Sequence, residues 1–167
     1  MIHVNDIDWD NWIPDQIATL LFVIKDNHIL LIRKKRGLGA GKINGPGGRI
    51  EEGETPEECA IRETEEELCI TPLNIEPRGR LFFYASDSIP HILGYVFTAS
   101  DYKGSPRETD EAVPVWTPLS EIPWSEMWED DRYWLPKIID GQTVDAWFTF
   151  TGETLLSYKV MERQTAI

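Results

Sequence analysis

Apolar and polar positions divide this chain into short strand-like segments and two helical ones. From Ile17 to Ile24 nearly every residue is apolar, which is typical of a strand covered on both faces. Asp26 and Asn27 then indicate a turn, and Ile29–Ile32 a second strand. Further short strands are expected at Leu81–Tyr84, Ile92–Thr98, Val113–Trp116, Ala146–Phe150 and Thr154–Tyr158.

A helix is expected to begin after Thr55, which can cap it. Pro56 suits the first helical position, and Glu58 completes a capping box with Thr55. The buried stripe of this helix is predicted to contain Ile61, Thr64 and Leu68.

A second helix is expected over Asp131–Ile139. Strands interspersed with helices predict an α/β/α layered domain with a mixed central sheet. At this length a single core is expected, so we predict an N-terminal extension over residues 1–12 and one domain over residues 13–167.

The net charge of −13 argues against a polymer nucleic acid as the partner, because duplex binding needs a cationic surface. A small polyphosphate still fits an acidic protein when a divalent cation mediates the contact. Cys59 and Cys69 are expected roughly 15 Å apart on one helix, too far for a disulfide. Free thiols, the acidic start of the chain and the absence of a long apolar run together predict a cytoplasmic protein without a membrane span.

Three glutamates, Glu63, Glu66 and Glu67, share one face of the first helix because their spacings are three and four residues. Their repulsion, and their place toward the C-terminal end of the helix, both disfavour folding. A bound Mg²⁺ would offset that repulsion, since it prefers oxygen ligands. The alternative is a solvated acidic face on an acidic protein.

These glutamates belong to a longer pattern. Gly48, Glu54 and Arg62 precede them at the spacing G-x5-E-x7-R-E-U-x-E-E-x-G-U, where U is a bulky aliphatic residue. On this match the chain resembles the Nudix hydrolases. The resemblance implies the Nudix fold and hydrolysis of a nucleoside diphosphate linkage with Mg²⁺, for which Mn²⁺ is a possible substitute.

The family resemblance also implies roles for particular residues. Arg62 would orient carboxylates, with Glu54 as its partner, and either Glu66 or Glu67 would accept the proton of the attacking water. The implied metal ligands are the carbonyl oxygen of Gly47 and the side chains of Glu63, Glu66 and Glu67.

Two positions depart from the box. Thr64 replaces a bulky aliphatic residue, and its hydroxyl needs a partner such as the carbonyl one turn back. Cys69 replaces the last glycine, so we expect a strained or altered helix end there.

A narrower resemblance covers nearly the whole chain beyond the extension. The matching runs are Lys34-Lys35-Arg36-Gly37, Gly39-Ala40-Gly41, Asn44-Gly45, Gly47-Gly48, Asp110-Glu111, Met127-Trp128-Glu129-Asp130-Asp131 and Tyr133-Trp134. They are similar to the oxidised purine nucleoside triphosphatases, the MutT-homologue branch. This implies release of nucleoside monophosphate and pyrophosphate by a monomer, with Glu111 as a further metal ligand. The implied substrate-binding residues are Thr19, Lys34, Asn44, Phe83, Trp128, Asp130 and Asp131.

Simple chemistry is compatible with these roles. Trp128 offers a flat face for a purine, and Asn44 carries a donor and an acceptor for its edge. Asp130 and Asp131 cannot both ionise in one apolar environment, so exchange of their proton would admit both 8-oxoguanine and 2-hydroxyadenine. The alternatives are a helix N-cap for the aspartates, core packing for Trp128, Thr19 and Phe83, and a solvated turn for Lys34.

Two other functions stay open. One is the same chemistry on another nucleoside diphosphate derivative, such as a methylated purine, a canonical triphosphate or a capped dinucleotide. The other is a catalytically silent nucleotide-sensing module, against which stands the presence of every box carboxylate.

Overall fold

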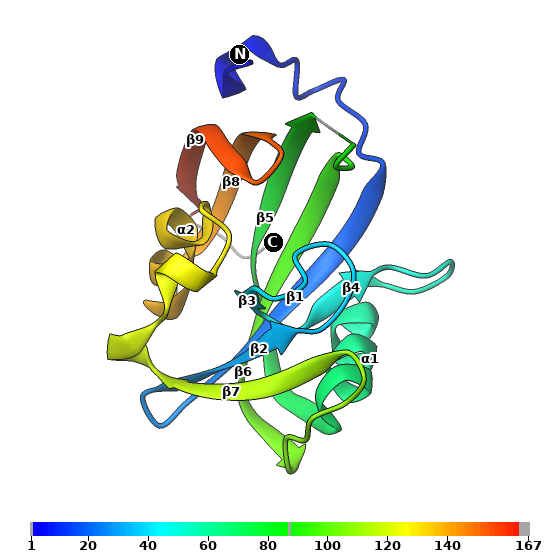
Figure 1. Cartoon of the computed structure of the whole chain (residues 1–167), viewed down its shortest axis with the longest axis vertical. Helices are drawn as coiled ribbons and strands as arrows, with labels where there is room; N and C mark the ends of the chain where they lie inside the picture. Colours follow the sequence, from blue (N-terminus) through cyan, green and yellow to red (C-terminus); the bar gives the residue numbers. More distant parts are fainter. Residues whose placement is uncertain (1, 87, 164–167) are drawn as a thin grey trace. The chain divides into compact units, whose positions relative to one another are not determined.

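The computed structural model describes residues 2–86 and 88–163. Met1 of the predicted extension, and Asp87 and residues 164–167 of the predicted domain, lie outside the described residues. Figure 1 shows the elements in chain order. The short 3₁₀ helices among the described residues are η1 (Val4–Asp6), η2 (Leu119–Glu121) and η3 (Trp124–Glu126). The helices and strands are β1 (Gln16–Lys25), β2 (His28–Lys34), β3 (Ile43–Asn44), β4 (Gly47–Arg49), α1 (Pro56–Leu68), β5 (Ile70–Ser86), β6 (Ile92–Gly104), β7 (Ala112–Pro118), α2 (Asp131–Ile139), β8 (Thr143–Thr151) and β9 (Thr154–Arg163).

The chain divides into two compact units. Unit 1 contains Met1–Ala18, Pro77–Val96 and Glu129–Ile167, and unit 2 contains Thr19–Glu76 and Phe97–Trp128. The predicted division into an extension and one domain stays a prediction.

In unit 2, β2 is the central strand of an antiparallel arrangement. It pairs with β1 through the predicted turn, where Asp26 and Asn27 both have positive φ angles, and with β3 and β7. These partners bury Ile29–Ile32 completely or nearly so. Helix α1 contacts β4 and β7.

The ends of α1 confirm the predicted capping. The Thr55 hydroxyl accepts the Glu58 amide and the Glu58 carboxylate accepts the Thr55 amide. The Thr64 hydroxyl donates to the Ala60 carbonyl at 2.7 Å, one helical turn earlier, as the sequence predicted. At the other end, Cys69 adopts the left-handed conformation with φ of 62°, which a β-carbon disfavours.

Replacing Cys69 by glycine is expected to stabilise the protein. The strain that glycine relieves in the folded state outweighs the extra conformational entropy that glycine gives to the unfolded chain. We expect the free energy of unfolding to rise by about 0.5–1 kcal/mol, or roughly 2 °C in Tm. Thermal unfolding of Cys69→Gly measures the gain. Cys69→Ala removes the thiol but keeps the β-carbon and should show no gain; equal stabilisation by both substitutions would assign the effect to the thiol instead.

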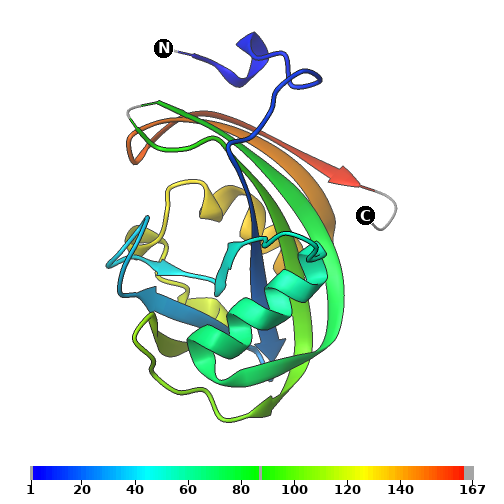
Figure 2. The ribbon, with the colours of Figure 1, turned by 90° about the vertical axis from the view of Figure 1, so that its right-hand side faces the viewer.

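In unit 1, β8 lies between β5 and β9. It pairs in parallel with β5 from Gly79↔Val144 to Ser86↔Thr151 and antiparallel with β9, so both pairing modes occur. Figure 2 shows the three as long curved strands side by side. Alternate residues face opposite sides of this sheet: Phe83 stacks on Phe148 at 5.0 Å, and Phe82 on Trp147 at 5.4 Å.

The observed β5, β6, β8 and β9 are longer than expected. The largest difference is in β5, where the sequence predicts only Leu81–Tyr84. Its first half contains Pro72 and Pro77 and a positive φ at Asn74, which obscure a strand pattern. The short β3 and β4 were also missed, because neither is long enough to produce a period.

The N-terminal segment packs on β5 and β9 within unit 1. The Val4 amide donates to the Ser157 hydroxyl at 2.9 Å, and Trp9 Nε1 donates to the Val4 carbonyl at 2.9 Å. Trp9 and Trp12 both lie edge-on to Phe82. The segment therefore covers the side of β5 opposite to Phe83, a location that its sequence did not reveal.

Candidate active site

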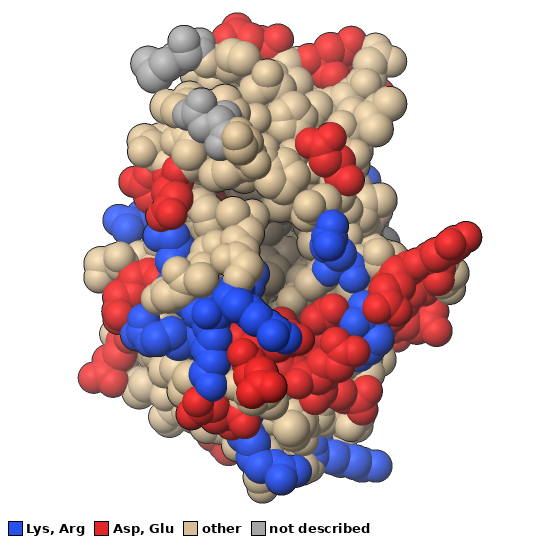
Figure 3. All heavy atoms as spheres, turned by 45° about the vertical axis from the view of Figure 1, so that its right-hand side comes forward, with Lys and Arg blue, Asp and Glu red and all other residues tan. Residues whose placement is uncertain are grey.

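Carboxylates of α1 and of the residue before β7 form an acidic cluster in unit 2. Oxygen atoms of Glu63, Glu67 and Glu111 all lie within 4.8 Å of one another. Because α1 contacts β7, residues far apart in the sequence converge here. Glu66 lies outside this trio, with its side chain half exposed. Figure 3 shows one face of the molecule, on which acidic side chains gather beside basic ones.

Glu67 is the most deeply buried of the three, with 4% of its surface exposed. The pKa of Glu67 is raised to about 8, first by burial and then by the charges of Glu63 and Glu111. One of its oxygens accepts the Gly47 amide at 3.2 Å. Glu67 thus connects the glycine-rich loop to the acidic cluster.

The Glu63 carboxylate lies between the Arg62 guanidinium and the backbone of Gly48. Burial raises the pKa of Glu63, while the hydrogen bond from Arg62 at 2.8 Å opposes that rise. A β-carbon on Gly48 would lie 2.5–2.7 Å from the carboxylate atoms of Glu63. The loop therefore approaches the carboxylate as closely as only glycine permits.

Arg62 organises the carboxylates around it, as the sequence predicted. Its guanidinium donates to Glu54 at 2.7 and 3.0 Å, a two-pronged pair, and also to Glu63 and to Glu66. This contact lowers the pKa of Glu54 to about 2, and the carboxylates raise the pKa of Arg62. The predicted Glu54–Arg62 partnership is confirmed.

The donor set of the cluster suits a hard divalent cation. It consists of carboxylate oxygens alone. Mg²⁺ and Mn²⁺ prefer such oxygen ligands, whereas softer metals prefer sulfur or nitrogen. The raised pKa values of Glu63 and Glu67 show that their charges lack sufficient compensation from the protein. A cation would supply it, so the residues fit the metal that the sequence implied.

Four of the predicted substrate-binding residues belong to unit 2. Thr19 is buried, and its hydroxyl lies 3.4 Å from the Cys59 thiol. The Lys34 ammonium donates to the Leu38 carbonyl at 2.7 Å. Asn44 accepts the amide of the next residue through its side-chain oxygen. The fourth is Trp128.

Trp128 is held by the glycine-rich loop. The Lys42 ammonium lies 5.2 Å from the centroid of its ring. Gly39 has a φ of +80°, and a β-carbon there would lie 2.8 Å from Trp128 Nε1. The loop thus fixes the ring that the sequence nominated for base stacking.

The other three predicted residues belong to unit 1. Phe83 stacks on Phe148, and Asp130 and Asp131 are both buried. Asp130 occupies the N-cap position of α2 without a capping hydrogen bond from its side chain. Its carboxylate instead accepts Trp134 Nε1 at 2.8 Å, and burial raises the pKa of Asp130. Side-chain capping therefore does not explain this aspartate.

Sequence reasoning missed two residues of the site. Cys59 is buried, its thiol lies 3.6 Å from the Gly48 carbonyl and 3.7 Å from an Arg62 nitrogen, and burial raises its pKa to about 11. Arg36 forms an ion pair with Glu111 at 3.1 Å. The sequence analysis named both residues, Cys59 as a free thiol and Arg36 within a matching basic run, but gave neither a role in the site. Both cysteines are free, as predicted.

A family model described as the NUDIX domain matches residues 14–138. The chain belongs to the Nudix family. Proteins named oxidized purine nucleoside triphosphate hydrolase from Danio rerio and Mus musculus are each 36% identical to it over 148 residues, which is 88% of this chain and 95% of theirs.

A solved structure of a MutT protein from Bacillus halodurans matches this Nudix chain with a TM-score of 0.78 at 26% identity. The match covers 87% of this chain and 97% of that one. The predicted Nudix fold, an α/β sandwich with a mixed sheet, and the assignment as a Nudix hydrolase are confirmed. Within residues 2–86 and 88–163, no helix is both long and apolar enough to cross a membrane.

Proposed function

We propose that this Nudix hydrolase cleaves oxidised purine nucleoside triphosphates to the nucleoside monophosphate and pyrophosphate, and so removes damaged nucleotides from the pool. The observation that carries the proposal is the acidic cluster of Glu63, Glu67 and Glu111, backed by Arg62 and approached by the glycine loop. Relatives named for this activity match over 95% of their length, which supports the substrate class. A monomer in the cytoplasm stays a prediction.

The metal we assign to the cluster is Mg²⁺, with Mn²⁺ as a substitute. When bound, such an ion neutralises the phosphate chain, polarises the attacked phosphorus and acidifies an attacking water. The ligands we assign are the Gly47 carbonyl oxygen and the carboxylates of Glu63, Glu66, Glu67 and Glu111.

The protein's own groups position the reaction. Arg62, clamped by Glu54, orients Glu63 and Glu66 through hydrogen bonds. Glu66 and Glu67 are the two candidates for the group that accepts the proton of the attacking water. Glu66 retains exposure to solvent, whereas Glu67 is buried against the Gly47 amide.

Base recognition is assigned to Asn44, Trp128, Asp130 and Asp131. A purine would stack on Trp128 and pair with the Asn44 amide. Because burial raises the pKa of Asp130 to about 6, this carboxyl can hold a proton below about pH 6 and then donate a hydrogen bond to the base. We assign contacts with the rest of the substrate to Thr19, Lys34 and Phe83.

A substrate panel tests the proposed function. With Mg²⁺ present, kcat/KM for 8-oxo-dGTP and 2-hydroxy-dATP should exceed that for dGTP and dATP by at least about tenfold, since one buried polar contact discriminates by that factor or more. Chelation of the metal should abolish turnover. Equal rates on normal and oxidised nucleotides would instead support a general nucleotide hydrolase, and absence of any turnover a sensor.

Substituting the aspartates tests the proton-exchange hypothesis. Asp130→Asn and Asp131→Asn each prevent one carboxyl from changing its protonation, so each should alter the ratio of kcat/KM between 8-oxo-dGTP and 2-hydroxy-dATP by roughly tenfold. In the parent protein this ratio should also change as the pH rises through the raised pKa of Asp130, where the donated proton is lost. If this ratio of kcat/KM values were unchanged in both variants, the proton-exchange hypothesis would be wrong.

A further inference from the structure

Arg36 stands at the edge of the acidic cluster because of strand pairing. Strands β2 and β7 are antiparallel with Lys34 opposite Ala112, and the Lys35 amide extends the ladder to the Glu111 carbonyl. Arg36 follows directly, and its Nη2 atom lies 3.1 Å from Glu111 Oε1. Its guanidinium is thus one carboxylate away from Glu63 and Glu67.

The cations near the cluster differ in how far they are already engaged. Arg62 is only 23% exposed and donates to Glu54, Glu63 and Glu66. The Lys34 ammonium donates to a backbone carbonyl. The Arg36 side chain is 65% exposed, and its ion pair with Glu111 uses one of five N–H donors. Its other donors are available to a ligand that approaches from solvent.

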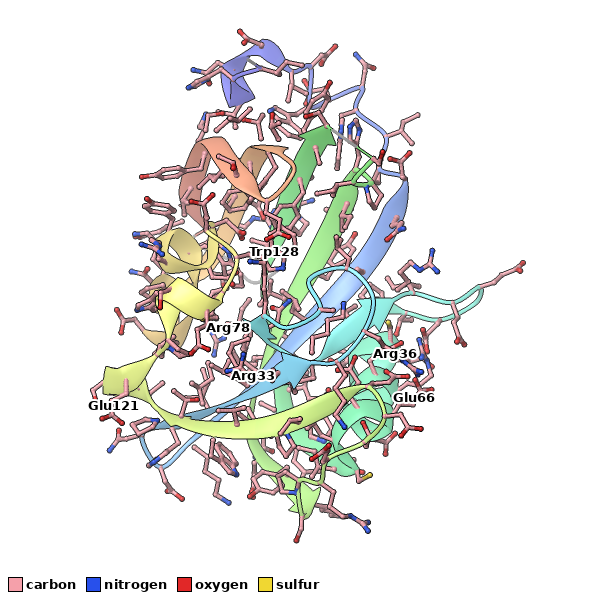
Figure 4. All side chains as sticks on the ribbon, in the orientation of Figure 1. Arg33, Arg36, Glu66, Arg78, Glu121 and Trp128 are labelled. Carbon is pink, nitrogen blue, oxygen red and sulfur yellow. The ribbon has the colours of Figure 1, made fainter. Side chains whose placement is uncertain are left out.

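A phosphate chain that enters this acidic site needs positive charge. Repulsion from the carboxylates increases with each phosphate, and a guanidinium can grip a phosphate with two parallel hydrogen bonds. Figure 4 shows Arg33, from the same basic run, apart from Arg36 and Glu66. Arg33 pairs with Glu126 rather than with a residue of the cluster.

We propose that Arg36 binds the terminal phosphate of the substrate and thereby sets a preference for nucleoside triphosphates over diphosphates. The inference rests on the proposed function, which it deepens. The ion pair with Glu111 holds the guanidinium in place before the nucleotide arrives.

Steady-state kinetics of Arg36→Gln with 8-oxo-dGTP and 8-oxo-dGDP tests the proposal. Loss of charge-assisted hydrogen bonds to one phosphate should raise KM for the triphosphate by about 10- to 100-fold. The kcat for the triphosphate and the KM for the diphosphate should change by less than about threefold, because neither depends on that contact. Arg36→Lys, which keeps the charge but lacks the fork, should fall between parent and Arg36→Gln.

Arg33→Gln is the matched control. It removes a guanidinium that is likewise partly exposed and ion-paired, but with Glu126, so the ratio of the two KM values should stay at the parent level. If Arg36 served only to position Glu111, Arg36→Gln would lower kcat on both substrates equally and leave their KM ratio unchanged. That result would overturn the proposal.

Calorimetric titration of pyrophosphate into the Mg²⁺-loaded protein separates this inference from the proposed function. Affinity should fall by roughly tenfold or more in Arg36→Gln and stay unchanged in Arg33→Gln. Failure of the parent protein to hydrolyse oxidised purines would contradict the proposed function alone. Equal pyrophosphate affinity in parent and Arg36→Gln would contradict the role of Arg36 alone.

Discussion

Glu67→Gln is expected to inactivate the enzyme while it stabilises the metal-free protein. Turnover should fall on the order of 10³-fold, since the substitution removes an assigned metal ligand and a candidate general base. Stability should rise because the native carboxylate is buried beside the like charges of Glu63 and Glu111.

The pH dependence of this stabilisation follows from linkage. In the folded metal-free protein the pKa of Glu67 is raised to about 8, first by burial and then by Glu63, whereas in the unfolded chain it is about 4.3. The folded state therefore holds the proton more tightly, and the free energy of unfolding falls as the pH rises from about 4.3 through about 8. The neutral amide of Glu67→Gln removes this loss. Above pH 8 the free energy of unfolding should therefore exceed that of the parent by on the order of 2 kcal/mol, or roughly 5 °C in Tm, whereas at pH 5 the difference should be small.

Thermal unfolding of parent and variant at pH 5 and pH 8.5, with and without Mg²⁺, measures both effects. Added Mg²⁺ should raise the Tm of the parent and have less effect on Glu67→Gln, because binding to the folded state stabilises it. Glu65→Gln is the control, since that exposed side chain pairs with Thr71 away from the cluster. A variant as active as the parent would refute the assigned role of Glu67.

Gly47→Ala is expected to have the second large effect. A β-carbon at Gly47 would lie 1.8 Å from the Thr19 carbonyl oxygen and 3.1 Å from the Leu20 α-carbon. Both are backbone atoms of β1, the pairing partner of β4, so no side-chain rotation can relieve the clash. We expect a loss of about 3 kcal/mol or more in the free energy of unfolding.

Activity should fall with it, by at least about 100-fold in whatever fraction of Gly47→Ala remains folded. Displacing β4 moves the amide that donates to Glu67 and the carbonyl assigned to the metal, and small misplacements are costly in catalysis. Denaturant unfolding and specific activity of the soluble protein measure the two losses. Gly94→Ala, where the nearest atom to a β-carbon is 3.8 Å away, should be tolerated; a tolerated Gly47→Ala would show that β4 can shift without consequence.

Local rules predicted several features of this protein well. The Thr55 capping box, the turn at Asp26-Asn27 and the hydroxyl bond of Thr64 depend on residues close in the sequence, and all three were found. The Glu54–Arg62 pair was also found, because a helix and the loop before it leave little choice of partner. Longer strands were underestimated where their stability comes from neighbouring strands rather than from a local pattern.

The sequence by itself determined which chemistry is available: the spacing of Glu63, Glu66 and Glu67 follows from helical geometry and needs no tertiary information. Tertiary structure alone decided that Glu111, rather than Glu66, completes the trio, and that Arg36 lies beside it. Likeness to a family nominated Glu111 but could not show its distance from α1. The physical reason is that β7 reaches α1 through packing between segments far apart in the chain, and no periodicity along the sequence records such a contact.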